Sequence, residues 1–362
     1  MRKIGLLTLP LHQNYGGILQ ILALYRFLLD QGFEPVFLHK EPVTPLKKQL
    51  FRSTIGRVLE RLPVDVRGYR ARAMHQRFVR AMMPRRTAIL RTEEDLAAAV
   101  AEEQLDAVIV GSDQVWRLDY HRDTGHMQYF LNFARGEHVR KIAYAASFGT
   151  EEWQYPQWSG EIGRLLAGFD AVSVREQAGR EICREEFGKE DVSVVLDPTL
   201  IVGMSLYDEL LERTDPVISE GSVMRYVLDP NPTVQRIANL VMSSLGKEED
   251  GIEIGVQGAS QDVPHWLRAF RDSGFVVTDS FHGTIFAIIF RKPFVSVANR
   301  ERGMVRFTSL LDALGLSDRL VAADDEERIA RMVDTPIDYG AVEQRLEELR
   351  KGSRSFLLSA LA

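Results

Sequence analysis

Residues 275–290 read FVVTDSFHGTIFAIIF, an apolar run that enters a polar turn and leaves it as a second apolar stretch of helical length. This order predicts a buried strand, a short loop and a buried helix. Ser280 is placed to cap the helix. The amides of Phe281, His282 and Gly283 then lie in its first turn, where free N–H groups and the helix dipole favour a phosphate or carboxylate. We expect His282 to contact that anion.

The same alternation extends over most of the chain. Apolar runs predict strands at 3–9, 33–38, 105–110, 141–146, 171–174 and 192–196, and a second series at 223–228, 252–256, 275–278 and 293–297. Helical stretches separate them, as around 18–29, 160–168, 177–187, 233–245, 265–271 and 283–290. Apolar strands that alternate with helices are typical of parallel sheets covered by helices. The predicted fold class is therefore α/β, with two Rossmann-like halves.

The domain organisation follows from this alternation of strands and helices. We expect an N-terminal Rossmann-like domain over 1–202, which carries a basic helical insertion at about 41–92, and a C-terminal one over 203–335. The stretch 203–222 is polar and predicts an irregular boundary. The charged segment 336–362 predicts a C-terminal helix that packs back on the N-terminal domain.

Composition narrows the class of protein. The chain has 362 residues, no apolar run long enough to cross a bilayer, and a single cysteine, Cys183. One cysteine gives neither an internal disulfide nor a thiolate cluster for zinc. The N-terminus lacks a small-residue cleavage site. We expect a soluble, cytoplasmic protein.

Residues 47–91 form a basic block that contains thirteen Lys or Arg and only two acidic residues, Glu60 and Asp65. Apolar residues are interleaved with these charges, as in an amphipathic helix that lies on an anionic membrane surface. A solvated, arginine-rich helix pair is the alternative. No aromatic-rich basic sheet or helix-turn-helix pattern accompanies the charge, so nucleic acid is not an expected partner.

Polar residues that directly follow predicted strands are candidate site residues, because ligands of open parallel sheets collect beyond the carboxyl ends of the strands. Arg175 in SVRE offers a planar fork suited to a carboxylate or phosphate. Asp197 in LDPT orients His282, accepts a substrate proton or caps the next turn. The group Arg300, Arg302 and Arg306 follows another strand, and one of these arginines is expected to complete an anion site, with Arg302 favoured.

Two loops of the first half add to this set. Residues 14–17, which are Asn14, Tyr15, Gly16 and Gly17, form a tight loop before a helix, and glycine lets a ligand approach the backbone closely. In the loop GSDQVW, Asp113 and Gln114 offer donors and acceptors for hydroxyl groups, and Trp116 either stacks on a sugar ring or fills the core. Neither loop matches a dinucleotide or P-loop motif, and the chain has no HExxH, GxSxG or cysteine-rich metal spacing.

Together, these motifs resemble one known family. The chain carries NYGGILQ at 14–20, GSDQVW at 111–116, SVRE at 173–176, LDPT at 196–199, TDSFHGTIFAIIFRKPF at 278–294 and LLDALGL at 310–316. Their order and their positions after strands, over roughly residues 4–320, resemble the polysaccharide pyruvyl transferase family. That resemblance implies a GT-B-like fold, in which two Rossmann-like domains with parallel sheets face a central cleft, and phosphoenolpyruvate as donor.

The resemblance also implies roles for the site residues. His282 becomes the acid that protonates the donor, while Asp197 or Asp113 assists deprotonation of a sugar hydroxyl. The donor is expected on Arg175, Arg302, Ser280, Phe281 and Gly283. The acceptor is expected on Asn14, Tyr15, Gly16, Gly17, Gln114 and Trp116.

No metal or cofactor is expected in this scheme, and the product is a pyruvate ketal on a sugar of a surface polysaccharide. The expected acceptor is a polyprenyl-diphosphate-linked oligosaccharide, met at the inner face of the cytoplasmic membrane through residues 47–91. Two other functions remain open. A nucleotide-sugar glycosyltransferase shares the two-domain architecture, because fold does not fix function. The other is a non-catalytic sugar-binding or membrane-scaffolding protein of the same fold.

Overall fold

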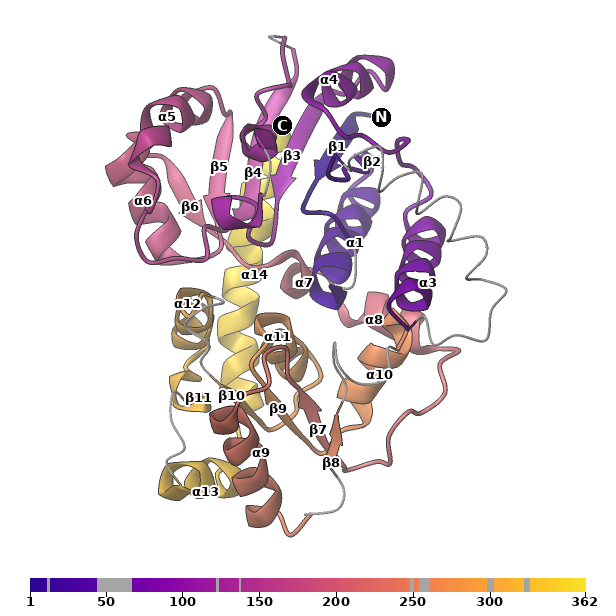
Figure 1. Cartoon of the computed structure of the whole chain (residues 1–362), viewed down its shortest axis with the longest axis vertical. Helices are drawn as coiled ribbons and strands as arrows, with labels where there is room; N and C mark the ends of the chain where they lie inside the picture. The colour runs from indigo at the N-terminus through magenta and orange to yellow at the C-terminus, as the bar shows by residue number, and fades with distance from the viewer. Residues whose placement is uncertain are drawn as a thin grey trace.

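In the computed structural model, the chain forms two α/β halves, each built on one parallel sheet (Figure 1). The structure describes residues 1–11, 14–43, 67–121, 124–136, 138–247, 251–253, 261–297, 303–321 and 326–362. The predicted α/β class with two Rossmann-like halves is confirmed. Each half places the ends of its strands toward the other, so the loops that follow the strands meet between the sheets.

The N-terminal sheet has the strand order β2-β1-β3-β4-β5-β6. Its strands are β1 Lys3–Leu7, β2 Glu34–Phe37, β3 Ala107–Gly111, β4 Arg140–Ala146, β5 Ala171–Val174 and β6 Val192–Val194. Its helices are α1 Tyr15–Asp30, α3 Arg67–Met82, α4 Glu93–Glu102, α5 Ser159–Ala167, α6 Gln177–Phe187 and α7 Pro198–Ile201, with short 3₁₀ turns η1 Leu118–Tyr120, η2 Thr124–Phe130 and η3 Pro156–Trp158. All of these strands were expected, with bounds within a few residues.

The C-terminal sheet has the order β11-β10-β9-β7-β8. Its strands are β7 Val223–Tyr226, β8 Gly251–Glu253, β9 Phe275–Thr278, β10 Phe294–Val297 and β11 Leu320–Val321. Its helices are α8 Met204–Leu211, α9 Pro232–Ser244, α10 Val263–Asp272, α11 Phe281–Ile289, α12 Val305–Leu314 and α13 Glu326–Asp334, with the 3₁₀ turn η5 Ser317–Arg319. The irregular boundary predicted for 203–222 is wrong over α8, where Leu206, Tyr207, Leu210 and Leu211 bury one face of a helix.

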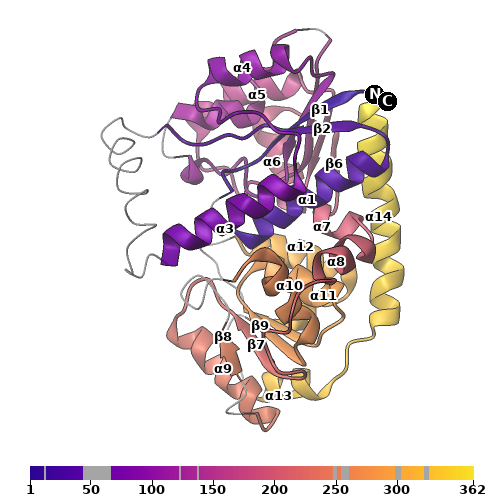
Figure 2. The same ribbon diagram turned by 90° about the vertical axis from the view of Figure 1, so that its right-hand side faces the viewer.

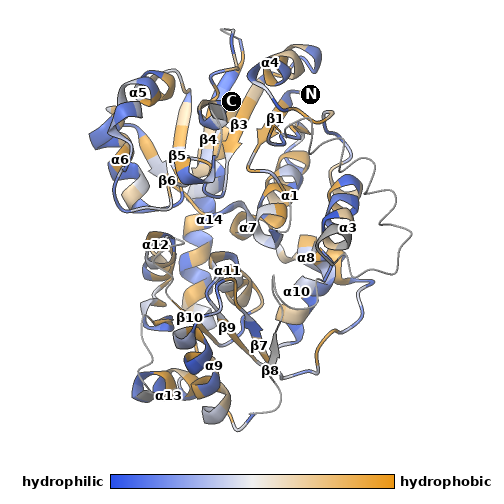
Figure 3. Cartoon of the chain, viewed as in Figure 1, coloured by the Kyte–Doolittle hydropathy of each residue, from blue (hydrophilic) through white to orange (hydrophobic). Residues whose placement is uncertain are grey.

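One hydrophobic core runs through both halves. It joins residues of β1 and α1, such as Ile4 and Leu22, to residues of β7 and α11, such as Met224 and Phe286. Figure 3 shows the apolar character of α1, β1 and β3 against the more polar α3. Tyr15 lies at the join, where its ring stacks on Trp266 with centroids 5.1 Å apart. The two halves are therefore packed together rather than only tethered.

The last helix, α14 Tyr339–Leu361, runs along both halves and brings the two chain ends side by side (Figure 2). At its start, the Tyr339 hydroxyl donates to the Lys292 carbonyl at 2.5 Å, which belongs to the second half. Farther along, Ser353 Oγ accepts from the Leu196 amide at 3.0 Å, and Arg140 Nη1 donates to the Ala360 carbonyl at 2.7 Å. This helix fixes the two sheets relative to each other.

Residues 44–66 of the basic insertion lie outside the described residues, so the prediction of a membrane-binding surface over 47–91 can be followed only from residue 67 onward. Within the described part, α3 lies against the join between the halves. The rings of His75 and Tyr15 meet edge to face with their centroids 4.9 Å apart, and Val79 is buried in the shared core. Within the described ranges, no helix is both long and apolar enough to cross a bilayer.

Candidate functional site

A cavity of about 290 Å³ opens where the loops of the two sheets meet, and we call it the cleft cavity. The first half contributes residues that follow β1 and β3, and the second half contributes residues that follow β7 and β9, together with α12. Its lining is Leu9, Pro10, Asn14, Asp113, Gln114, Tyr120, Tyr226, Leu228, Asp279, Ser280, Phe281, His282 and Arg306. The position agrees with the rule that ligands of parallel sheets collect beyond the carboxyl ends of strands.

Two helix N-termini meet at this cavity. Asn14 caps α1 by accepting the Gly17 amide at 2.9 Å, and Ser280 caps α11 by accepting the Gly283 amide at 3.2 Å. The Ser280 cap was expected from the sequence, but it occupies the Gly283 N–H, which is therefore not available to an anion. The remaining first-turn amides and both helix dipoles favour negative charge at this point.

His282 lies against the first turn of α1. A Cβ atom added to Gly16 would be 2.1 Å from the imidazole Cγ and Nδ1 atoms, a distance at which atoms overlap. Glycine is thus needed at position 16 for the ring to lie where it does. The loop glycine predicted to contact a ligand instead makes room for the candidate acid.

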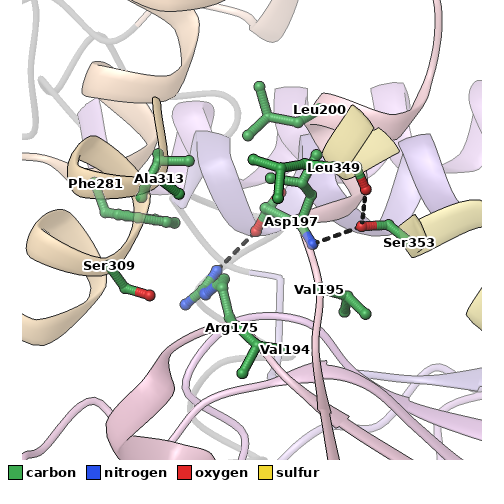
Figure 4. A pocket seen from close by; sticks show the side chains of 12 residues that line it. Arg175, Val194, Val195, Asp197, Leu200, Phe281, Ser309, Ala313, Leu349 and Ser353 are labelled. Carbon is green, nitrogen blue, oxygen red and sulfur yellow. Dashed lines mark hydrogen bonds and ion pairs between the residues drawn. The ribbon is translucent and has the colours of Figure 1, made fainter. Parts of the chain in front are cut away.

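A buried carboxylate, Asp197, stands behind His282 and joins several elements, and Figure 4 shows its contact with Arg175. Its Oδ2 atom accepts from Arg175 Nη1 at 2.7 Å and from Ser112 Oγ at 2.9 Å, and it lies 3.5 Å from His282 Nε2. Its Oδ1 atom accepts from the Thr199 amide and hydroxyl at 3.0 and 2.7 Å. Burial alone would raise the pKa of Asp197, but His282 and Arg175 hold it well below its usual value.

Two arginines lie over the same aromatic ring. The guanidinium carbon of Arg175 is 4.6 Å from the centroid of the Phe281 ring, and that of Arg306 is 5.1 Å from it. Burial lowers the pKa of Arg306 to about 10, and the charge of Arg175 acts in the same direction, so Arg306 remains a cation at neutral pH. Two buried like charges are unfavourable unless an anion compensates them.

Arg175 has hydrogen-bonding capacity that the protein does not use. Its side chain is 2% exposed, and its Nε and Nη2 atoms have no hydrogen-bond acceptor. It lines a smaller cavity of about 70 Å³ behind Phe281, which Figure 4 shows, rather than the cleft cavity itself. A buried donor without a partner costs about 1–3 kcal/mol, so a ligand acceptor that reached it would be strongly favoured.

The acidic residues of the cleft differ in their roles. Asp113 has a φ of 65°, which is unusual for a residue other than glycine. Its Oδ2 atom accepts from Asn14 Nδ2 at 3.1 Å, and its Oδ1 atom from the Gln114 amide at 2.9 Å. Asp279, which the sequence did not single out, accepts the amides of Leu228 and Asp229 at 2.7 and 2.9 Å and so fixes the loop after β7.

The predicted site residues divide into three groups. His282, Ser280, Phe281, Asn14, Asp113 and Gln114 line the cleft cavity. Arg175, Asp197 and Gly16 lie directly behind that lining, as do Gly17 and Gly283, whose amides are used by the helix caps. Arg302 and Arg300 lie outside the described residues, whereas Arg306, the third arginine of that group, lines the cavity.

The assignment of Trp116 and Tyr15 to an acceptor site is not supported by their positions. Trp116 is fully buried, stacks on Phe130 and donates its Nε1–H to the Tyr129 carbonyl, so its ring fills the core. The ring of Tyr15 is buried at the join of the two halves. The aromatic side chain of the same segment that does line the cavity is Tyr120, which the sequence analysis missed. Among the described residues, no group of three His, Cys, Asp or Glu could hold a metal ion.

The Asp197 cluster predicts a pH-dependent contribution to stability. Because the folded state lowers the pKa of Asp197, this carboxylate stabilises the fold above the unfolded pKa of about 4, and the contribution is lost as the pH falls through the lowered pKa. Removing one partner of a buried ion pair costs about 3–5 kcal/mol. We therefore expect Asp197→Asn to lose about that much unfolding free energy at pH 7, and less at pH 3, in urea titrations.

Glu209→Gln is the control for this prediction, because Glu209 pairs with Arg26 at 2.7 Å while its side chain is 49% exposed. Exposed pairs contribute less than about 1 kcal/mol. A loss in Asp197→Asn that did not change between pH 7 and pH 3, or that matched the control, would contradict the role given to the buried carboxylate.

Two solved structures of similar architecture carry the description UDP-GlcNAc 2-epimerase. The UDP-GlcNAc 2-epimerase from Neisseria meningitidis bound to UDP-GlcNAc is 9% identical, with a TM-score of 0.55 over 100% of this chain and 99% of that one. A putative UDP-N-acetylglucosamine 2-epimerase from Listeria monocytogenes is 11% identical, with a TM-score of 0.52 over 96% and 90%. At such identities the likeness shows the fold alone, and it confirms the GT-B-like arrangement of two domains.

Sequence comparison is more specific. No curated protein matches the chain. The family model described as polysaccharide pyruvyl transferase matches residues 14–301, which is more than half of the chain and includes the caps of α1 and α11, Arg175, Asp197 and His282. The chain therefore belongs to the polysaccharide pyruvyl transferase family.

Proposed function

We propose that this enzyme transfers the enolpyruvyl group of phosphoenolpyruvate to a sugar of a surface polysaccharide, or of its lipid-linked precursor, and forms a pyruvate ketal. The observation that carries the proposal is the convergence of two helix N-termini, Arg306 and His282 on one cavity, with the buried Arg175 directly behind its lining. Phosphoenolpyruvate carries a carboxylate and a phosphate. Helix N-termini and arginine side chains are groups that bind both of these anions.

The donor site follows from the positions of the two arginines. Arg306 lines the cavity, and Arg175 lies behind Phe281 with two N–H groups that have no acceptor in the protein. A planar guanidinium binds a carboxylate or phosphate through two parallel hydrogen bonds. We assign the donor anions to Arg306, Arg175 and the first-turn amides of Phe281 and His282.

His282 is the proposed proton donor. Its Nε2 atom is buried and lies 3.5 Å from Asp197 Oδ2, so this carboxylate orients the ring. Asp197 is not a proposed base, because its side chain is 1% exposed and does not line the cleft cavity. Asp113 lines the cavity and takes that role.

The proposed reaction balances with these groups. His282 gives its proton to the methylene carbon of the donor, which becomes a methyl group beside an oxocarbenium-like centre. One sugar hydroxyl attacks that centre and its proton passes to Asp113. The bond between carbon and phosphate oxygen then breaks, and a second hydroxyl of the same sugar closes the ketal while its proton leaves with the phosphate. The proton on Asp113 returns through solvent to His282.

The partner proposals rest on composition alone. A polyprenyl-diphosphate-linked oligosaccharide at the inner face of the cytoplasmic membrane would present a diphosphate and an anionic surface together. The basic residues 47–91 are suited to both. The cytoplasm supplies phosphoenolpyruvate to that face.

Donor binding is tested by thermal unfolding with phosphoenolpyruvate and, separately, UDP, CMP and GDP sugars. We expect phosphoenolpyruvate to raise the Tm, because a ligand at 100 times its Kd adds about 2.7 kcal/mol of stability. Arg175→Met and Arg306→Met should each lose most of that increase. Arg331→Met, at an arginine whose side chain is 69% exposed on α13, should keep it. Stabilisation by a nucleotide sugar in place of phosphoenolpyruvate would show a glycosyltransferase instead.

Proton donation is tested separately from binding. His282→Gln should retain the phosphoenolpyruvate-dependent rise in Tm but lose about 10²–10⁴-fold in turnover, the range typical of a general acid. Turnover is measured as phosphate release with methyl β-D-glucopyranoside, methyl β-D-galactopyranoside, cellobiose or lactose as acceptor. His265→Gln, on the partly exposed face of α10, is the matched control. If His282→Gln kept most of its turnover, the role of His282 as acid would be wrong.

A further inference from the structure

Tyr120 is an exposed aromatic residue held at the border of the cleft cavity. It ends the turn η1, is 43% exposed and lines the cavity. The guanidinium of Arg117 lies over its ring, 5.0 Å from the centroid, and Gln114 Nε2 donates to its hydroxyl at 3.2 Å. Arg117 thus covers one face of the ring, and the exposed part is left toward the cavity.

A second cavity of about 580 Å³ lies beside this residue, and we call it the outer cavity. Arg117, Glu151, Glu152 and Gln154 line it from the first half, and the backbone of Gly303–Val305 lines it from the second. The volume of the outer cavity lies within the range of small-molecule sites, about 300–1,000 Å³, and the volume of the cleft cavity lies just below it. The outer cavity combines the polar side chains of its first-half lining with the apolar residues Met304 and Val305.

The two cavities share a border. Arg117 Nη1, in the outer cavity, donates to Gln114 Oε1, in the cleft cavity, at 3.1 Å. Gly149 packs against the side-chain amide of Gln114, since a Cβ atom added to Gly149 would be 1.9 Å from Gln114 Oε1. Gly303 in turn approaches the Gly149 carbonyl, so the backbones of both halves meet at this point. The two cavities are therefore adjacent and separated by the Gln114–Arg117 pair, so a ligand long enough to pass over this pair would contact both.

We propose that Tyr120 and the outer cavity form the acceptor site, which binds a saccharide of at least two sugar rings. One ring stacks on Tyr120 and presents its hydroxyls to Asp113 and His282, and the next ring lies in the outer cavity. The inference rests on the proposed function for the order of events, but the binding site itself is argued from this geometry.

The chemistry of the lining selects the ligand class. Glu151 and Glu152 disfavour an anionic group such as a diphosphate in the outer cavity, because like charges repel. An apolar ligand would cover the polar groups of the lining without offering them hydrogen bonds, and this disfavours it. A neutral polyhydroxyl ligand both donates to these carboxylates and accepts from Arg117 and Gln154. Its C–H face also packs on the Tyr120 ring, which is amphipathic in the same way.

Saturation-transfer NMR tests this site with methyl β-D-glucopyranoside, methyl β-D-galactopyranoside, cellobiose and lactose as probes. We expect wild-type protein to transfer saturation to both rings of at least one disaccharide. Tyr120→Ala should reduce that transfer at least fivefold, whereas Tyr120→Phe, which keeps the ring, should stay within twofold of wild type. The double variant Glu152→Ala with Gln154→Ala should lose transfer to one of the two rings and leave monosaccharide binding unchanged.

The rise in Tm with phosphoenolpyruvate is recorded for the same variants. A Tyr120→Ala variant that keeps this rise but loses saccharide transfer supports the site and excludes misfolding. Saccharide transfer that depends on Tyr120 in a protein that does not bind phosphoenolpyruvate would refute the proposed donor while the saccharide site stands. No transfer to any of the four sugars, or equal transfer with Tyr120→Ala and wild type, would overturn the inference.

Discussion

The carboxylate of Asp197 joins four parts of the fold at the floor of the cleft. It accepts from Arg175 after β5, from Ser112 after β3 and from Thr199 in α7, and it lies 3.5 Å from His282 of the other half. A buried charge is tolerated only where it is paired and hydrogen-bonded, so these groups are held together. The position of the candidate acid and that of an anion-binding arginine therefore depend on the same carboxylate.

The close approach of the two halves orients the site before a ligand binds. Gly16 lets the first turn of α1 contact the His282 ring, and the shared core and α14 hold the halves in that relation. Two helix N-termini and two arginines are thus oriented before any ligand arrives. Preorganised dipoles and cations of this kind stabilise developing charge without reorganisation during the reaction.

The sequence predicted features whose signal is local. The apolar run after Ser280 identified the cap of α11, and the alternation of strands and helices identified both sheets. It did not reveal which aromatic residue after β3 faces the cleft. The loop there turns at Asp113 with a φ of 65°, which no pattern signals in a residue other than glycine, and Trp116 enters the core while Tyr120 lines the cavity. The apolar face of α8 was overlooked because its polar flanks resemble a linker.

The role of Asp197 could not be chosen from the sequence, because capping, orienting a histidine and accepting a proton all suit an aspartate after a strand. In the structure, Asp197 caps the next turn through its hydrogen bond with Thr199, and its other oxygen lies beside His282. Likewise, the sequence analysis favoured Arg302 over Arg306, whereas the helical position of Arg306 in α12 is what brings its guanidinium over Phe281. Long-range packing decides both cases.

A crystal structure of the protein with phosphoenolpyruvate tests the central claim most directly. The account predicts the ligand in the cleft cavity, with its anionic groups on Arg306, Arg175 and the start of α11, and with its methylene carbon facing Nε2 of His282. Phosphoenolpyruvate bound away from these groups, or with its methylene carbon turned away from His282, would contradict the account.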